Sequence, residues 1–463
     1  MDDKRQKIQL QLTLALDRQT GEVKPEGPEQ GTELSMAGHD TESQVSTVAL
    51  MEVVVGDVNM RSALQQVRTN KGAPGADGMT VAQLPQYLRK HWRELREQLL
   101  SGSYEPQPVR RVWIDKPDGG KRKLGIPTVL DRFVQQSLLQ ALQPLWDPTF
   151  SEHSYGFRPG RSAHQAVEQA QEYIDAGFGW VVDIDLEKFF DRVNHDVLMS
   201  RVARRVEDKR VLKLIRAFLN AGVLEDGLVS PSDEGTPQGG PLSPLLSNLL
   251  LDELDRELEQ RGLRFVRYAD DCNIYVGSQR AGERVMGSIT RFVERKLKLK
   301  VNAAKSAVDK PSKRKFLGFS FTRGPQSKRR LAPQTKKRFK RRVQEMTLRS
   351  RGRSLERVVR ELGEYLKGWL GYFGFCQTPS VLNELAGWLR RRLRALVWHQ
   401  WRRGPRRYTE LVARGVDPYL AACTANSPHG TWHISHSRAL DTALPNGYFT
   451  SLGLPPLKCT EVS

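Results

Sequence analysis

Apolar residues recur along the chain with two different spacings, and each spacing predicts a different kind of element. A repeat of three to four residues is typical of a helix that buries one face. Loops rich in Gly and Pro punctuate these repeats, for example KGAPGADGMT at 71–80. The pattern predicts helices over 60–70, 81–102 and 130–150, and over most of 196–222. In 238–262 it predicts a turn followed by a long helix.

Shorter apolar runs bounded by turn residues predict strands. The segment 107–127 predicts a hairpin, with Val112 and Ile114 in its first strand, PDGG as its turn and Leu124 in its second strand. Further strands are predicted at the start of 179–190, and at 264–269, 271–276, 298–302 and 315–321. Beyond about residue 330 the chain becomes helical and very basic, which predicts a linker near 325–335.

The charge balance indicates the kind of partner. Among 463 residues, 73 Lys and Arg face 53 Asp and Glu, which gives a net charge of +20. A basic excess of this size attracts polyanions, so it predicts contact with nucleic acid. The four cysteines form no C-x-x-C pair, which argues against a disulfide scaffold and fits a reducing cytosol. The sequence shows neither a signal-peptide core nor a run long enough to span a membrane.

Two adjacent carboxylates interrupt an apolar stretch at 267–276, RYADDCNIYV. Asp270 and Asp271 would repel each other by roughly 4 kcal/mol at about 4 Å and an effective dielectric constant near 20. Asp is favoured in turns, where its side chain bonds the local backbone, so a purely structural hairpin is the alternative. The apolar flanks, however, place this turn at the end of a sheet with a buried face.

A third carboxylate ends another predicted strand, in WVVDIDLEKFF. Asp185 is favoured over Asp183 because it lies closer to the strand end. Mg²⁺ accepts carboxylate oxygens together with substrate phosphates. Two such ions can activate an attacking hydroxyl and hold a leaving pyrophosphate. The three carboxylates therefore predict phosphoryl transfer at a polynucleotide 3′ end, with two Mg²⁺ ions for which Mn²⁺ can substitute.

An ordered series of motifs resembles a known family. Tyr268-Ala269-Asp270-Asp271 resembles the Y-x-D-D box of reverse transcriptases. The other matching blocks, in chain order, are GKRKLGIPTVLDR, SYGFRPGRSAHQAV, DIDLEKFFDRVNH, GTPQGGPLSPLLSN, LKLKVNAAKSAV and KFLGFSF. Together they resemble the reverse transcriptase–maturases of bacterial group II introns. The resemblance covers about 60–455, and SPHGTWHISHSRALDTALPN is similar to the class C branch, which carries no H-N-H endonuclease.

The resemblance implies roles for individual residues. Asp185, Asp270 and Asp271 would be the catalytic, metal-binding carboxylates, and Phe190 the steric gate that excludes a ribose 2′-hydroxyl. Ordinary core packing is the alternative for such a phenylalanine. The remaining nucleotide-binding residues would be Gln238 and Gly239, beside the nucleotide, and Lys116 and Arg122, on the triphosphate. Asp115 departs from the family pattern and puts a negative charge beside Lys116.

Nucleic acid would be held by a larger set of residues. The resemblance places Arg158 and Arg161 on the template backbone, and Lys305 and Gly318 near the primer. The basic C-terminal helices would bind RNA phosphate through Lys336, Lys337, Arg341, Arg391, Arg392, Arg394, Arg402 and Arg403. Aromatic residues interleaved with them at helical spacing are expected to be mostly buried: Trp369, Tyr372, Phe373, Trp388, Trp398 and Trp401. His433 stands where Arg is commoner in relatives.

The implied fold is α+β: a right-hand polymerase with a helical thumb and a small C-terminal DNA-binding region. Its parts would be a disordered polar extension (1–52), fingers (53–165), palm (166–328), thumb and maturase domain (329–403) and DNA-binding region (404–463). Its partners would be group II intron RNA, an RNA template with a DNA primer, target DNA and dNTPs. It would act in the bacterial cytoplasm and would have no membrane partner. Whether it forms a homodimer is left open.

Two other functions compete with this interpretation. One is a retron, diversity-generating or defence-type reverse transcriptase, against which QGGPLSP and the long basic region argue. The other is an RNA-binding splicing maturase whose polymerase is inactive, against which the complete set of three carboxylates argues. A zinc site formed by Cys423, His429, His433 and His436 is disfavoured, because their spacing matches no zinc-finger pattern.

Overall fold

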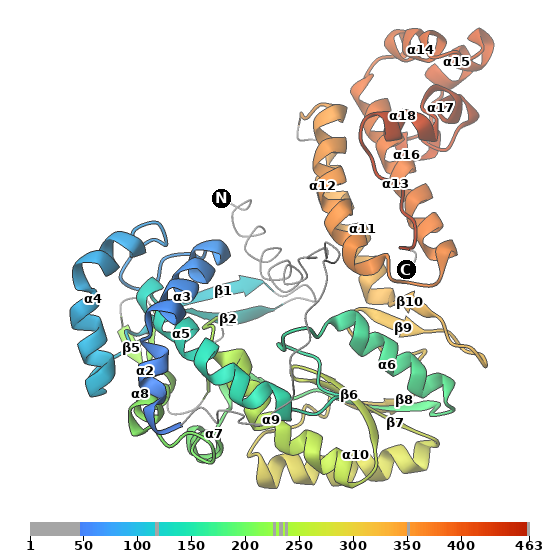
Figure 1. The fold of residues 1–463 in the computed structure, drawn as a ribbon. Coiled ribbons are helices and arrows are strands. Elements are labelled where there is room, and N and C mark those ends of the chain that lie inside the picture. Colours follow the sequence, from blue (N-terminus) through green and yellow to red (C-terminus); the bar gives the residue numbers. More distant parts are fainter. Residues whose placement is uncertain are drawn as a thin grey trace, which may run out of the picture. The chain divides into compact units, whose positions relative to one another are not determined.

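The computed structural model describes residues 47–115, 120–225, 228–230, 235–236, 239–349 and 352–460 (Figure 1). They divide into two compact units. The first contains the residues up to Ala170 together with Trp180–Val308, and the second contains Gln171–Gly179 together with the chain from Asp309 onward. This division assigns 309–328 to the helical unit, whereas the sequence analysis places those residues in the palm. The predicted extension at 1–46 lies outside the described residues.

The first unit begins with a helical subdomain. Its main helices are α2 (Leu50–Val54), α3 (Asp57–Asn70), α4 (Leu84–Ser101) and α5 (Val129–Trp146). Leu84, Leu88, Leu95 and Leu99 recur at helical spacing along α4 and are buried. The helix ends as predicted at Gly102, whose left-handed φ of 68° suits glycine. The predicted helices at 60–70, 81–102 and 130–150 are therefore confirmed.

A four-stranded sheet follows in the order β2-β1-β4-β5. Its strands are β1 (Val109–Asp115), β2 (Lys121–Ile126), β4 (Val223–Glu225) and β5 (Leu228–Ser230). β1 and β2 pair antiparallel with Trp113 opposite Lys123, which confirms the predicted hairpin. β1 also pairs in parallel with β4. The second hairpin, β4–β5, is absent from the sequence prediction.

The second sheet of this unit has the order β6-β7-β3-β8. Its strands are β6 (Arg264–Tyr268), β7 (Asp271–Val276), β3 (Trp180–Ile184) and β8 (Ala307–Asp309). Helix α9 (Ser243–Gln260) packs against β6, and α10 (Gln279–Lys296) packs against β3 and β7 (Figure 1). The strands are apolar on both faces because helices cover them. This sheet carries the predicted carboxylates.

Most of 196–222 is helical, as predicted. It forms two helices, α7 (His195–Val202) and α8 (Lys209–Asn220), because Asp208 caps a new helix by accepting the backbone N–H of Arg210. One strand prediction for this unit is wrong, since the run at 298–302 forms no strand. Only Val301 pairs there, in a single bridge to Leu186. Its lysines are exposed while Leu299 and Val301 are buried, and this alternation is what made the run resemble a strand.

The second unit is mostly helical. It contains a short hairpin of β9 (Phe319–Phe321) and β10 (Arg329–Leu331), which continues into α11 (Pro333–Met346), α12 (Leu355–Phe373) and α13 (Pro379–Gln400). Part of α6 (Ala163–Asp175) also belongs to it. Small helices complete it: α14 (Gly404–Ala413), α15 (Pro418–Ala425), α16 (Thr431–Ile434), α17 (Arg438–Ala443) and α18 (Asn446–Ser451).

The interleaved aromatic residues of this unit are less buried than predicted. Trp398 and Trp401 are buried, with 1% and 4% of their surface exposed. The other four are half-buried: Trp369, Tyr372, Phe373 and Trp388. Phe373 packs on Trp369 and Tyr372, and the Nζ of Lys340 lies over the Trp388 ring, 5.7 Å from its centroid.

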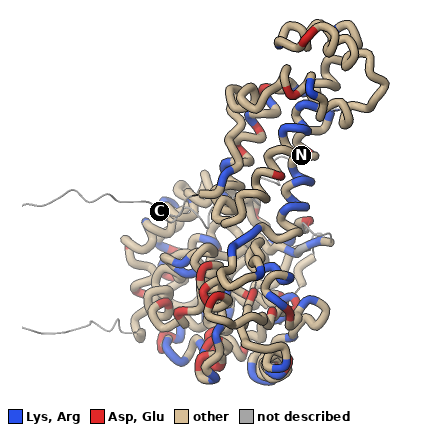
Figure 2. The backbone as a smooth tube through the Cα atoms, turned by 90° about the vertical axis from the view of Figure 1, so that its right-hand side faces the viewer, with Lys and Arg blue, Asp and Glu red and all other residues tan. Residues whose placement is uncertain are grey.

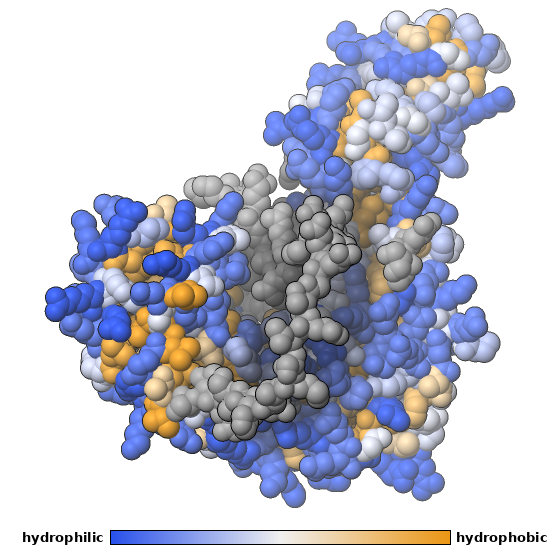
Figure 3. Space-filling model, viewed as in Figure 1, coloured by the Kyte–Doolittle hydropathy of each residue, from blue (hydrophilic) through white to orange (hydrophobic). Residues whose placement is uncertain are grey.

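The surface is strongly hydrophilic. Lys and Arg recur along the backbone of both units (Figure 2), and hydrophilic residues dominate the face seen in Figure 3, with smaller hydrophobic patches. Among the described residues, the helices fall short of the length and apolarity that crossing a bilayer requires. The distribution of charge fits a polyanionic partner.

Candidate active site

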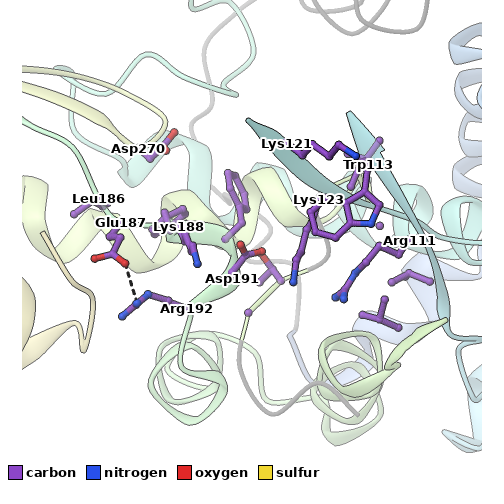
Figure 4. Close-up of a pocket in the computed structure, with 18 of the residues that line it drawn as sticks. Arg111, Trp113, Lys121, Lys123, Leu186, Glu187, Lys188, Asp191, Arg192 and Asp270 are labelled. Carbon is purple, nitrogen blue, oxygen red and sulfur yellow. Dashed lines mark hydrogen bonds and ion pairs between the residues drawn. The ribbon is translucent and has the colours of Figure 1, made fainter. Parts of the chain in front are cut away.

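The three predicted carboxylates line one cavity of about 1210 Å³ in the first unit. Figure 4 shows part of this cavity with Asp270 labelled. Asp185 immediately follows β3, and Asp270 and Asp271 lie where the β6–β7 turn leads into β7. Phe190 and the inner residues of β1 and β2 form other parts of its wall. The cavity therefore brings together residues from strands that are far apart in the sequence.

Strand register explains why the carboxylates meet. β3 and β7 pair antiparallel with Ile184 opposite Cys272, so the next residue of β3, Asp185, lies beside Asp271. Asp183 lies inside the strand, opposite Asn273, and does not line the cavity. The geometry thus distinguishes two carboxylates that the sequence left in competition. Burial behind them raises the pKa of the Cys272 thiol, which keeps that side chain neutral.

The loop at 302–306 holds Asp185 in place. The backbone N–H of Asn302 donates to the Asp185 carbonyl at 2.8 Å, and the Asp185 N–H donates to Ser306 Oγ at 3.0 Å. Lys305 places its Nζ 3.6 Å from Asp185 Oδ2 and also lines the cavity. The predicted primer-side lysine therefore contacts one of the predicted catalytic carboxylates directly and places a positive charge beside its oxygen.

The residues suit Mg²⁺, although they do not form a finished cage. Within the described part of the chain, no three His, Cys, Asp or Glu side chains are arranged as a metal site. Mg²⁺ commonly takes one or two carboxylates and completes its shell with water and substrate phosphates. Asp185 beside Asp271 supplies such hard oxygen ligands at the edge of an open cavity, and Lys305 already shows that a cation is accommodated there.

Opposite the carboxylates, the β1–β2 hairpin presents basic and aromatic side chains (Figure 4). Arg111, Trp113, Lys121 and Lys123 line the cavity. Arg111 and the Trp113 indole N–H both donate to Glu225 of β4, at 2.7 and 3.1 Å. Hydrogen bonding to Arg111 lowers the pKa of Glu225, so this anchor stays ionised.

Sequence reasoning missed these four residues, although their spacing carries the signal. Side chains two positions apart on a strand share a face, so Arg111 with Trp113, and Lys121 with Lys123, point to one side of the hairpin. The predicted triphosphate residue Lys116 lies outside the described residues. The other predicted triphosphate residue, Arg122, lies in β2, where its backbone pairs with Ile114 of β1.

Phe190 lies in the short 3₁₀ helix η3 (Phe189–Asp191) and lines the cavity. Its carbonyl accepts the backbone N–H of Thr236 at 2.6 Å, and His195 Nε2 lies 2.6 Å from the Gly235 carbonyl oxygen. Residues 235–236, which precede the predicted nucleotide loop, are thus hydrogen-bonded to the Phe190 backbone and to His195. Gln238 lies outside the described residues.

Gly239, predicted to lie beside the nucleotide, packs against the backbone of β2 and does not line the cavity. Its φ is +130°, and an added Cβ would lie 2.6 Å from the carbonyl oxygen of Gly125. Gly125 itself lines the cavity, whereas Gly239 stands behind it. Any larger residue here would push the wall of the cavity inward.

The other predicted nucleic-acid contacts divide into buried and exposed groups. Arg158 is 8% exposed, and it donates to Asp147 and to the carbonyls of Ser151 and Ser154. Arg161 pairs with Glu152. These contacts organise the loop at 151–158, and neither arginine lines the cavity.

In the second unit, several predicted RNA-binding arginines bond to the protein itself. Arg391 donates to the Trp432 carbonyl at 2.9 Å, Arg392 to Thr347 Oγ1 at 3.0 Å, and Arg394 to the Leu444 carbonyl at 3.1 Å. Side chains at the surface include Lys337, Arg341, Arg402 and Arg403, with Lys336 half-buried.

Gly318 has a structural role in the same unit. Its φ is +87°, and an added Cβ would lie 2.8 Å from the Phe373 ring. The Thr335 hydroxyl donates to its carbonyl at 2.7 Å. The glycine therefore allows the turn before β9 to pack closely on α12.

Comparison with known proteins identifies the family of this chain. Residues 114–321 match the family described as reverse transcriptase (RNA-dependent DNA polymerase), and 336–415 match the group II intron, maturase-specific domain. The protein YkfC of Escherichia coli (strain K12) is 34% identical over 308 residues, which cover 58% of this chain and 81% of YkfC. The chain belongs to the family of group II intron reverse transcriptase–maturases.

Other similarities are more partial. The group II intron-encoded protein LtrA of Lactococcus lactis subsp. cremoris is 36% identical over 206 residues, or 44% of this chain. That match spans only about a third of LtrA, 34% of its length. Among solved structures, telomerase from Candida albicans gives a TM-score of 0.41 at 15% identity, with 67% of this chain and 64% of that chain covered. A likeness this weak supports no inference.

Proposed function

We propose that this chain is an RNA-directed DNA polymerase that also binds its group II intron RNA, assists its splicing and supports its mobility. The observation that supports the polymerase most strongly is the cavity. It joins the carboxylates at the ends of β3 and β6 to a wall of basic side chains and to Phe190. Membership of the family supports the splicing and mobility roles.

The reaction would be attack of a primer 3′-hydroxyl on the α-phosphate of a dNTP. Asp185, Asp270 and Asp271 would hold Mg²⁺, which when bound stabilises negative charge on the phosphates and favours loss of the hydroxyl proton. Arg111, Lys121 and Lys123 face them across the cavity and would neutralise the triphosphate. Together these groups would orient a triphosphate whose oxygens carry the negative charge.

Two aromatic residues would define the nucleotide's position. Phe190 would lie under the sugar, where a flat ring leaves no space for a 2′-hydroxyl. Trp113 is 46% exposed, and Glu225 fixes its indole by a hydrogen bond. A fixed, exposed ring is a surface on which a nucleobase can stack.

Binding of intron RNA would use the second unit. Exposed Lys337, Arg341, Arg402 and Arg403 would meet phosphates, while Arg391, Arg392 and Arg394 would mainly hold the helices that present them. Phosphate contact gives affinity with little sequence dependence. Recognition of a particular intron would come from RNA shape and unpaired bases. Target DNA is proposed as a further partner of the C-terminal helices.

The test is extension of oligo(dT) on poly(rA) with dTTP and Mg²⁺. The wild-type chain should make product, and Asp270→Ala should lower the rate at least about 10³-fold, because several kcal/mol of charge stabilisation are lost. Asp196→Ala is a matched control, since Asp196 is exposed on α7 and pairs with Arg216 on α8. An inactive wild-type protein that still promotes intron splicing would leave only the maturase role.

A further inference from the structure

Arg267 of β6 is buried in the first unit, and neither it nor its partner Asp255 has any exposed side-chain surface. Its five guanidinium N–H groups meet five acceptors. Nε and Nη2 donate to the two carboxylate oxygens of Asp255, and Nη2 also donates to Ser154 Oγ at 2.7 Å. Nη1 donates to Asn248 Oδ1 at 2.9 Å and to the Ala269 carbonyl at 3.0 Å. The arginine therefore ties α9, the loop at 151–158 and the Y-A-D-D turn together.

The main chain reinforces this junction. The Arg267 N–H donates to the His153 carbonyl at 2.9 Å, and the Tyr155 N–H donates to the Arg267 carbonyl at 2.9 Å. The loop thus runs beside β6 as a short parallel strand would. Arg158 closes the same loop from the other side by donating to the Ser154 carbonyl at 3.0 Å.

The turn that receives these contacts has an unfavourable backbone. Ala269 has a φ of +56°, which side chains other than glycine rarely adopt. Gly156 packs so closely on it that an added Cβ would lie 2.2 Å from the Ala269 nitrogen. Asn248, which accepts from Arg267, also donates to the Gly156 carbonyl at 2.8 Å. A strained backbone persists only where its surroundings determine it.

Stability alone does not explain a buried ion pair at this place. Well-packed apolar residues commonly serve a fold as well as a buried pair does, because two charges must be removed from water. Directional donation to a backbone carbonyl is what apolar residues cannot supply. At Arg267 that carbonyl belongs to the residue immediately before Asp270.

We propose that Arg267, held by Asp255, is a positioning residue that fixes the turn at 268–271 and so sets Asp270 and Asp271 against Asp185. It contacts neither substrate nor metal. The proposal rests on the polymerase function above, since it gives those carboxylates a reaction to carry out. The segment SYGFRPG would accordingly brace the catalytic turn rather than bind the template.

Two variants separate positioning from folding. Arg267→Lys keeps a positive charge for Asp255 but lacks the fork that reaches five acceptors. The double variant Asp255→Leu/Arg267→Met replaces the pair by apolar side chains and leaves no buried charge. Arg93→Met on α4 is the control, because Arg93 pairs with Glu97 on the exposed face of that helix. Thermal unfolding, hydrogen exchange of peptides across 264–272, and poly(rA)/oligo(dT) extension at varied Mg²⁺ and dTTP would be measured.

Both variants should remain folded, with turn amides that exchange at least about tenfold faster while the rest of the first unit stays protected. The kcat should fall on the order of 30-fold with little change in KM for dTTP, because catalytic groups misplaced by an ångström lose rate rather than binding. More Mg²⁺ should be needed for half-maximal rate. The control should match the wild type in every measurement.

A folded double variant with wild-type exchange at the turn and wild-type kcat would overturn the proposal. So would loss of protection throughout the first unit in both variants, since that result assigns Arg267 to folding. An inactive wild-type protein would refute the polymerase function instead. Hydrogen exchange would then still decide whether Arg267 orders the turn.

Discussion

Replacement of Gly156 by alanine is predicted to damage catalysis without disrupting the fold. The added Cβ would lie 2.2 Å from the Ala269 nitrogen, 2.9 Å from the Tyr268 carbonyl carbon and 3.0 Å from the Ala269 Cα. All three are backbone atoms of the Y-A-D-D turn, so a side-chain rotation cannot relieve the contact. Real Cβ atoms essentially never approach closer than 3.0 Å, so the loop and the turn must separate by about 0.8 Å (3.0 − 2.2).

The expected magnitude follows from that displacement. Overpacking of this kind typically costs about 1–3 kcal/mol of stability, which a folded domain tolerates. A shift near 1 Å in catalytic groups can cost about 100-fold in rate. Gly156→Ala should therefore lower kcat for dTTP addition by about 100-fold and lower the thermal midpoint by several degrees. Single-turnover extension and calorimetry on the same preparation would measure the two effects.

Gly277→Ala is the matched control. Gly277 follows the opposite end of β7, has no positive φ and would place its Cβ in open space. It should keep wild-type kcat. If Gly156→Ala proved as active as the wild type, or if both variants lost rate equally, the inferred packing of the SYGFRPG segment on the turn would be wrong.

Three further outcomes are expected. Phe190→Val should raise ribonucleotide incorporation relative to deoxyribonucleotide at least about tenfold, and unchanged sugar selectivity in competition assays would exclude a gate. RNA binding, measured by filter retention, should weaken at least about tenfold between 50 and 200 mM salt, whereas a flat response would refute phosphate contact. Burial raises the pKa of Asp131 to about 6. Because this exceeds its unfolded value, stability should fall as pH rises from about 4 to 6, by about 3 kcal/mol; Asp131→Asn should remove that component in urea unfolding curves, and an unchanged pH profile would contradict the assignment.

The elements that carry the site could be predicted because their signals are local. The PDGG turn between apolar runs predicts the β1–β2 hairpin, and apolar flanks around Asp270 and Asp271 predict the β6–β7 turn. The prediction that Asp185 joins them rests on strand ends sharing an edge, and the β3–β7 register bears it out. In these motifs, residues that are close in the sequence indicate where a strand ends and a turn begins.

What could not be predicted depends on contacts between distant residues. An arginine in a motif looks the same whether it faces solvent or, like Arg158, is enclosed by carbonyls from its own loop. Arg267 lies within RYADD, yet its role depends on Asp255 and Ser154, which lie elsewhere in the chain. The position of the break between α7 and α8 depends on one capping residue, Asp208, whose carboxylate accepts the backbone N–H of Arg210.

The central claim is that carboxylates from the ends of two strands act together on one nucleotide. Single dTTP addition to a primed poly(rA) template by Asp185→Asn and by Asp183→Asn tests it most directly, because the two aspartates are two positions apart and, of the two, Asp185 lines the cavity. The account predicts loss of addition by at least about 10³-fold in Asp185→Asn and near wild-type rate in Asp183→Asn. Equal rates in the two variants, or the reverse order, would contradict it.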